Sequence, residues 1–402
     1  MRTLRLALLA LWFLFAFQIF YYAIDIFPLY VLSKILLPAS ALFISYLLAL
    51  GFLLRGSAYP HSIFLSGIFL FLVPLSALMS YINFSQPFLQ GVAAQIKLMP
   101  IFFYFLSLTV FKKLHVGGKD LTYSLIILGI VSLSVYYSVH LFFDMFRWSS
   151  DESRVVIYDT VRGYRLNLPV VFIVILIFYL YRRFIEERRL IYVLFLAPAI
   201  FYLVVFWKQR FELLGIFLTL LLISAKAFTR RPVTVMMFVS LAGSILFSFL
   251  RIDYFHGEIL SHSVILRMGT IETIIHVLSE NWMNVLFGVG NLLGTEDLNF
   301  RSLYGSNFWP SDVGWLGIIF EFGITGTLLF AYIYILLIRN SYRYAADETP
   351  AIIMALRDYV YMTILISPLI PSLPYLMGVY TTTLAIFVYY NHNVCVLEGE
   401  IA

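Results

Sequence analysis

The chain has 402 residues, of which 62% are hydrophobic and only 12% are charged. Together with a mean hydropathy of +0.92, this composition excludes a soluble domain and indicates a polytopic membrane protein. The net charge of +5 does not indicate nucleic-acid binding, because excess Lys and Arg in a membrane protein mostly determine topology. The single cysteine, Cys395, excludes an intramolecular disulfide and a thiolate metal cluster.

Long apolar segments predict an all-α fold of about twelve transmembrane helices in one domain covering residues 1–402. The segments do not alternate with period two, which favours helices over a barrel. The predicted spans lie near residues 4–24, 28–54, 62–82, 90–111, 120–143, 167–184, 190–207, 211–228, 232–251, 312–338, 352–370 and 373–390.

The basic residues predict the orientation of the spans. They gather in alternate short loops, and short loops rich in Lys and Arg face the cytoplasm. We therefore expect both termini to be cytoplasmic. The residues that define this side are Arg2, Arg5, Arg55, Lys112, Lys113, Lys119, Arg182, Arg183, Arg188, Arg189, Lys226, Arg230, Arg231, Arg339 and Arg343.

Two segments on the opposite, outer face are too long to be turns, namely residues 144–166 and 252–311. Loops of this length in a compact protein are usually functional or disordered. Both contain aromatic residues, including Trp148, Trp282 and Trp309, which favours ordered segments lying on the membrane surface.

The larger outer segment contains a predicted short amphipathic helix. Its apolar residues recur at three- and four-residue spacing and so share one face, with Arg267 at the edge of that face. A turn with two glycines follows, and the chain then enters the span that begins at Asp312. The apolar stripe consists of Val264, Met268, Ile271, Ile275 and Leu278, and the turn contains Gly288 and Gly290.

Basic residues on the outer side are candidate phosphate ligands. Lys208 and Arg210 lie in the outer turn WKQRFELL, where the positive-inside rule does not expect them. Arg165 and Arg267 are further candidates, because guanidinium groups bind phosphate oxygens bidentately. The alternative for the outer turn is snorkelling at the interface, with Glu212 as a local partner. Lys97 lies inside a span and needs a partner, which fits either a structural ion pair or a substrate contact.

Three residues are candidate general bases: His262, Asp312 and Glu321. Asp312 precedes a helix, so an N-terminal cap is the alternative for it. Glu321 lies about two turns into the span, where capping does not explain it. The outer loops contain no DxD pair and the chain contains no HExxH motif, so we expect chemistry without a metal or another cofactor.

The order of Arg267, LFGVGNLLG and EFGITG resembles the O-antigen polymerase and O-antigen ligase superfamily. WKQRFELL stands where such proteins place an outer-end arginine. The resemblance implies a GT-C-like glycosyltransferase of the bacterial inner membrane, acting at the periplasmic face. The implied donor is a glycan linked to undecaprenyl pyrophosphate, which Arg210, Lys208, Arg165 and Arg267 would hold. The implied partners are membrane lipids, a chain-length regulator and a flippase, with no nucleic acid.

One departure from the family pattern favours the polymerase branch. Ligases of this superfamily place a histidine just before the span that begins here at Asp312, where this chain has SDVGWL. The expected activity is therefore transfer of the lipid-linked glycan to the non-reducing end of another lipid-linked repeat unit. Two alternatives stay open: an O-antigen ligase that uses lipid A-core as acceptor, and a flippase or transporter of polysaccharide units.

Overall fold

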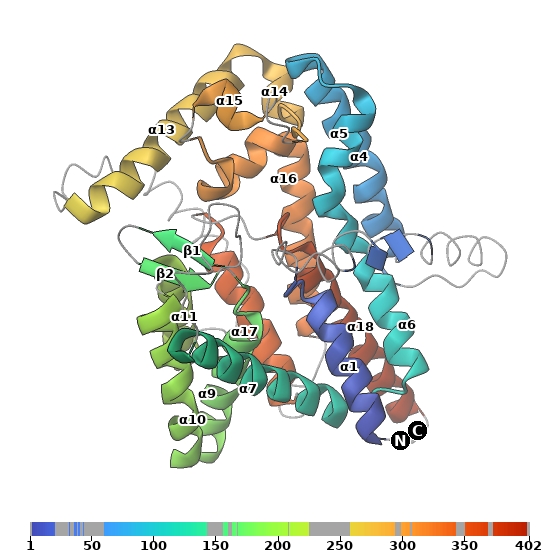
Figure 1. Cartoon of the computed structure of the whole chain (residues 1–402). Helices are drawn as coiled ribbons and strands as arrows, with labels where there is room; N and C mark the ends of the chain where they lie inside the picture. Colours follow the sequence, from blue (N-terminus) through green and yellow to red (C-terminus); the bar gives the residue numbers. More distant parts are fainter. Residues whose placement is uncertain are drawn as a thin grey trace.

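The computed structural model describes residues 2–20, 60–142, 156–159, 163–166, 168–207, 209–224, 258–293, 299–305, 308–342, 350–368 and 373–399, with single positions between 32 and 43. Within these ranges the chain is helical apart from one short hairpin (Figure 1). The hairpin joins β1 (Val156–Asp159) to antiparallel β2 (Gly163–Leu166). It belongs to the first outer segment, for which the sequence predicted order without a specific structure.

The first half of the described chain contains α1 (Arg2–Ala16), α4 (Ser62–Phe84), α5 (Phe88–Ala94), the 3-10 helix η2 (Gln95–Phe102), α6 (Phe103–Lys113), α7 (Gly118–Phe142), α9 (Val171–Glu187) and α10 (Leu190–Tyr202). The second half contains the π-helical turn η3 (Leu203–Trp207), α11 (Arg210–Ser224), α13 (Glu258–Glu280), α14 (Trp282–Phe287), α15 (Phe300–Tyr304), the 3-10 turn η5 (Pro310–Asp312), α16 (Gly314–Ser341), α17 (Ala351–Ile366) and α18 (Met377–Gly399).

Five helical stretches in the described residues are long and apolar enough to cross a membrane. Each coincides with a predicted span, and their presence confirms the transmembrane character. The stretches are Ser62–Phe84, Phe88–Lys113, Gly118–Phe142, Leu190–Trp207 and Gly314–Ser341. The helices α1, α9, α11, α17 and α18 coincide with five further predicted spans, whereas 28–54 and 232–251 fall almost wholly outside the described residues. The total of about twelve stays a prediction.

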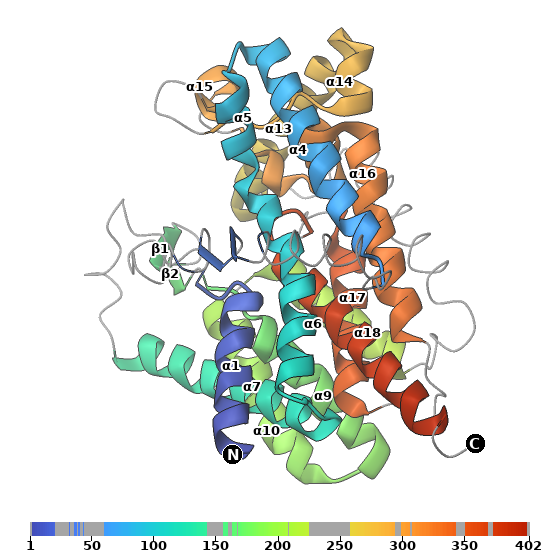
Figure 2. The ribbon, with the colours of Figure 1, turned by 90° about the vertical axis from the view of Figure 1, so that its right-hand side faces the viewer.

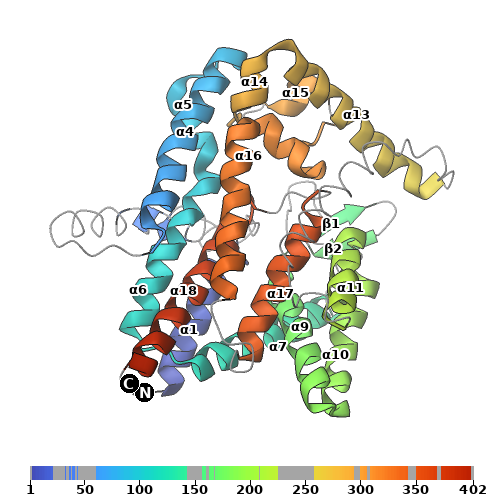
Figure 3. The same ribbon diagram turned by 180° about the vertical axis from the view of Figure 1, so that it is seen from behind.

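The helices form a bundle with a helical cap at one end. Figures 1 and 3 show α14 and α15 beside the ends of α4 and α5, with α14 above α16 and α13 extending to the side, while α1 begins and α18 ends at the opposite end. Figures 1 and 2 show α7 lying across the bundle beside α9. Large aromatic side chains fill the core because they bury the most apolar area per residue. Phe13, Phe103, Phe111, Phe172 and Tyr380 are completely buried.

Charged residues at the end opposite the cap hold helix ends together. The Arg5 guanidinium lies 2.8 Å from Asp120 at the start of α7 and donates to the carbonyl oxygen of His115. Further inside, Arg182 of α9 forms a buried ion pair with Asp358 of α17, with Nη2 donating to Oδ1 at 2.7 Å. These contacts give Arg5 and Arg182 a structural role at the end that the sequence predicts to be cytoplasmic.

The predicted amphipathic helix is present as α13, and its predicted apolar face is confirmed in part. Ile274 is fully buried and Val277 is 8% exposed, whereas Ile275 is 56% exposed. The buried face is the one that packs on Phe308 and Phe320. Ile271 and Leu278 of the predicted stripe pack in this cluster. Ile274 is buried in place of Ile275, because both are apolar and only their packing partners distinguish them. The segment is therefore a small helical cap with its own core.

Candidate functional site

Asp312 lies at the point where the cap joins the bundle. It ends η5, and its backbone N–H donates to the carbonyl oxygen of Trp309 at 3.0 Å. The Asp312 side chain is exposed and accepts a hydrogen bond from the Ser311 hydroxyl at 3.4 Å. In the described structure the N-cap of α16 is Val313, without a side-chain cap bond. Helix capping therefore does not account for Asp312.

The residues at the end of α17 pack against the start of α16, next to Asp312. Gly314 has a φ of +59°, and a Cβ there would overlap the carbonyl oxygen of Pro368 and lie 2.8 Å from that of Ser367. Trp315 reinforces the contact, because its indole N–H donates to the Ser367 hydroxyl at 2.9 Å. Only glycine permits this approach of two backbones. The first turn of α16 is thus fixed against the end of α17.

The basic outer turn lies at the same end of α17. Gly215 of α11 packs so closely on α17 that a Cβ there would meet Met362 at 3.1 Å and overlap Ile366. Arg210 begins α11, about 7 Å before Gly215 along the helix axis, so its backbone lies near the level of the α17 end. Lys208 and the side chain of Arg210 lie outside the described residues. Glu212 accepts a hydrogen bond from the Trp207 indole at 2.9 Å.

The strand that bears Arg165 contacts the turn before Lys208. β2 packs on η3, the π-helical turn that ends at Trp207, and π-helical turns occur frequently at functional sites. Figure 2 shows the hairpin set apart from α16 and α17. The backbone of Arg165 therefore lies near η3, while its side chain lies outside the described part.

Arg267 approaches the junction from the cap. It lies on α13 three residues before Thr270, so both share one face of the helix. The Thr270 hydroxyl accepts a hydrogen bond from the Trp309 N–H at 3.4 Å, which directs this face toward η5. Arg267 itself is half-buried. His262 is also on α13, but its side chain lies outside the described residues.

Lys97 and Glu321 form a buried ion pair between η2 and α16. The Lys97 ammonium binds Oε2 of Glu321, and the two residues are 9% and 5% exposed. The Tyr375 hydroxyl donates to Oε1 at 2.9 Å, so both carboxylate oxygens are engaged. Lys97 also lies 4.9 Å from the Tyr375 ring centre and 5.2 Å from that of Phe322, within the range of cation–π attraction.

Both helices that bear the pair are irregular at this point. η2 is a run of eight residues in 3-10 conformation, unusually long for that form. α16 is broken at Gly323, whose φ of 67° and ψ of −176° are not helical. Irregular backbone at membrane depth is found where it is buried in protein or lines a cavity. Such sites often bind substrates or ions.

The segment that follows α14 supports this break. Val289 donates its N–H to the carbonyl oxygen of Phe320 at 2.8 Å, a carbonyl next to the helix break. A Cβ at Gly288 would lie 2.5 Å from the backbone of Glu321, and one at Gly323 would overlap the backbone of Leu286 and Phe287. The glycines of FGVG and EFG therefore dock the two segments backbone to backbone.

Polar side chains fix the same segment on its other side. Gln86 accepts a hydrogen bond from the Leu293 N–H at 2.9 Å and donates to the carbonyl oxygen of Asn291 at 3.1 Å. The Asn291 amide donates to the carbonyl oxygen of Ala94 at 3.0 Å. Residues 288–293 are thus held between α4, α5 and α16, with backbone groups satisfied by side chains.

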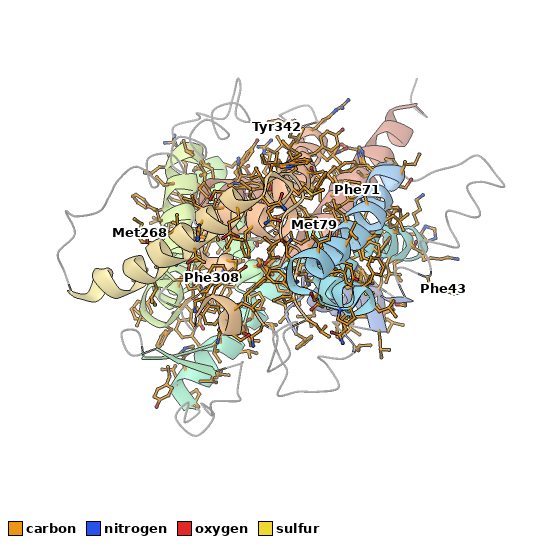
Figure 4. The ribbon with its side chains drawn as sticks, turned by 90° about the horizontal axis from the view of Figure 1, so that it is seen from above. Phe43, Phe71, Met79, Met268, Phe308 and Tyr342 are labelled. Atoms are coloured by element: carbon orange, nitrogen blue, oxygen red, sulfur yellow. The ribbon has the colours of Figure 1, made fainter. Side chains whose placement is uncertain are left out.

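The cap presents aromatic surface next to Asp312. The Arg301 guanidinium lies 3.3 Å from the centre of the Trp309 ring, which is 40% exposed. Tyr304 and Phe308 pack on each other behind it, and burial raises the pKa of the Tyr304 hydroxyl. Figure 4, which looks down onto the cap, labels Phe308 beside α13. An exposed ring stabilised by a cation is a suitable surface for stacking.

Comparison with family models, curated proteins and solved structures finds no match for this chain. Among the described residues, no group of three or more His, Cys, Asp or Glu side chains could hold a metal ion. The candidate site around Asp312 is therefore described by the geometry of this chain alone.

Sequence reasoning singled out Lys97 and Glu321 separately but missed that they pair, although two opposite charges in apolar spans are the signal for it. It also missed Tyr375 and Arg301, whose role depends on folding and which have no local motif.

Proposed function

We propose that this protein is a metal-independent membrane glycosyltransferase that polymerises a bacterial surface polysaccharide of the O-antigen type. The observation that supports it most is the convergence around the start of α16. α13, which bears Arg267, contacts η5 beside the exposed carboxylate of Asp312. α11, which begins at Arg210, packs on α17, whose end contacts Gly314. β2, which bears Arg165, packs on η3 just before α11. Several cations next to one potential base suit a substrate that contains a pyrophosphate.

In this proposal the donor is a glycan on undecaprenyl pyrophosphate. Arg165, Lys208, Arg210 and Arg267 bind the phosphate oxygens and stabilise the charge that develops on the leaving pyrophosphate. An acceptor hydroxyl oxygen bonds to the anomeric carbon while the bond from that carbon to the pyrophosphate oxygen breaks. The lipid pyrophosphate leaves with the electron pair. No metal or other cofactor is required.

Asp312 is the proposed general base that takes the proton of the acceptor hydroxyl. Its exposure and its position beside the cationic elements support this choice. Glu321 is a weaker candidate because both its oxygens already bind Lys97 and Tyr375, and His262 on α13 is the third. The Trp309 ring, three residues before Asp312, offers a surface on which an acceptor sugar can stack.

We further propose the bacterial inner membrane as the location, with a GT-C-like arrangement of about twelve spans. The termini are cytoplasmic and the capped end is periplasmic in this proposal. The basic residues near the start of α1 and the end of α6, at the end opposite the cap, support this orientation. The partners are the lipid-linked oligosaccharide and membrane lipids, with a chain-length regulator and a flippase acting on the same glycan.

One observation favours a second candidate function, transport of lipid-linked sugar units. Lys97 and Glu321 are buried charges at breaks in two helices, and discontinuous helices with ionisable residues are typical of transporters. The pair is neutral as a whole and closed by Tyr375. For this reason we place polymerisation first and treat transport as an outcome of the test.

The test is the surface-glycan pattern of a strain without this gene, with the wild-type chain or the Asp312→Asn chain added back. Core capped by a single repeat, restored to a ladder by the wild type but not by Asp312→Asn, supports the polymerase. Bare core with long polymer retained on the lipid carrier indicates a ligase. Single repeats trapped on the cytoplasmic side indicate transport and overturn the proposal.

A further inference from the structure

We infer that Lys97, Glu321 and Tyr375 form a latch that positions the first half of α16, and with it Asp312. The latch is defined by these three side chains. The claim that the latch positions a reacting group, Asp312, rests on the proposed function. The claim that the latch fixes the half-helix is independent of it. The inference follows from how α16 is broken and from what holds each of its halves.

The first half of α16, Gly314–Phe322, is a short helix that ends at the break at Gly323. A helix interrupted by a glycine in non-helical conformation has no continuous hydrogen-bond ladder to keep its two halves aligned. Asp312 immediately precedes this half-helix, about 13 Å along the axis from Glu321. Anything that fixes Glu321 in space therefore also restricts where Asp312 can lie.

The latch fixes Glu321 from two directions. Lys97 approaches Oε2 from η2, and Tyr375 approaches Oε1 from the turn that precedes α18. A carboxylate held at both oxygens has one allowed orientation. Three segments distant in the sequence thus meet at one buried side chain. Because both carboxylate oxygens are engaged, a structural role suits Glu321 better than that of a proton acceptor that faces a substrate.

The latch is sensitive to charge because it is buried. Replacing one member by a neutral residue leaves an uncompensated charge, which is strongly unfavourable in a low-dielectric interior. Replacing both charged members removes the charge problem and leaves packing largely unchanged. A single change is therefore expected to displace the half-helix strongly. The double change, which removes the latch without leaving an unpaired charge, is expected to displace it less.

The first experiment measures the position of the half-helix without using activity. In a Cys395→Ser background, a cysteine at Ser311 is labelled by a membrane-impermeant maleimide in the purified full chain reconstituted in bilayer nanodiscs. Lys97→Met and Glu321→Gln should each change the labelling rate by about tenfold or more, a change equivalent to about 1.4 kcal/mol. The double variant should change the rate in the same direction by a smaller factor, because the latch is lost but no charge is left unpaired.

Two further variants keep the result interpretable. Lys113→Met removes an exposed lysine at the end of α6 and should leave the labelling rate unchanged. Tyr375→Phe removes a single hydrogen bond without leaving a charge, so it should change the rate in the same direction by a smaller factor even where a single charge variant does not fold. Labelling rates equal to the parent in Tyr375→Phe and in every folded charge variant overturn the latch.

The second experiment tests the link to the proposed reaction. On a lipid-linked repeat unit, Lys97→Met should lower kcat about tenfold or more while KM for the donor stays within about threefold, because the latch does not touch the substrate. A rise in KM with unchanged kcat would show that Lys97 binds substrate directly. Changed labelling in a protein without polymerase activity would retain the latch and refute the proposed function instead.

Discussion

Gly323→Ala is the most direct test of the broken helix. At φ 67° and ψ −176° the backbone is in a region that is essentially restricted to glycine, which costs other residues about 1–3 kcal/mol. An added Cβ would also overlap the backbone of Leu286 and Phe287, and relieving such overpacking costs about 1–3 kcal/mol more. The expected loss in unfolding free energy is therefore about 2–6 kcal/mol.

The assay is thermal unfolding of the purified chain in nanodiscs. An unfolding entropy of about 2.1 cal/mol/K per residue means that a chain of 402 residues loses about 1 °C of Tm per kcal/mol. Gly323→Ala should thus lower Tm by about 2–7 °C. Gly67→Ala is the matched control, because Gly67 lies in helix α4 with no atom within 4 Å of the added Cβ.

Gly67→Ala should raise the unfolding free energy by about 0.5–1 kcal/mol, since alanine is the better helix residue. The result that refutes the reasoning is an equal, small stabilisation in both variants. It would mean that α16 is a continuous helix at Gly323 and that the docking of residues 286–288 on Glu321 does not exist in the folded protein.

Four further predictions follow from single sites. Arg182→Met should lower the unfolding free energy by about 3–5 kcal/mol by stranding the buried Asp358, and adding Asp358→Leu should recover most of the lost Tm. Arg210→Ala should abolish polymer in a glycan ladder while membrane abundance stays normal; normal chain lengths would contradict its role. Asp312→Asn should reduce turnover of purified protein about 10²–10⁴-fold, which an unchanged rate would disprove. Trp309→Ala should raise KM for the acceptor about two- to tenfold in steady-state kinetics, with equal KM values counting against a stacking surface.

The helices were predictable where one physical requirement dominates. A run such as 62–82 must be helical to satisfy its backbone in lipid, and the structure has a helix there, Ser62–Phe84. The break at Gly323 was not predictable from the same rule, because EFGITG is also compatible with a continuous helix. What decides the break is docking against Gly288 and Val289, which are distant in the sequence.

The candidate site shows the same division. The predicted outer position of Arg210 conflicts with the positive-inside rule, and that conflict was visible in the sequence. The pairing of Lys97 with Glu321 depends on two spans that are 224 positions apart along the chain, so no local pattern reveals it. The choice of Ile275 over Ile274 for the apolar face of α13 was mistaken in the same way, since packing on Phe308 and Phe320 determines that Ile274 is buried.

The glycine motifs that resemble O-antigen polymerases have a complete structural explanation in this chain. Gly288 and Gly323 allow two backbones to touch, and this requirement would hold whether the protein transfers sugars or transports them. Fold-level likeness of this kind therefore has little weight for function. The functional proposal depends instead on charged groups that packing does not require, Asp312 and the outer arginines. If Asp312→Asn and Arg210→Ala both keep full polymer synthesis, the glycines remain explained and the glycosyltransferase assignment fails.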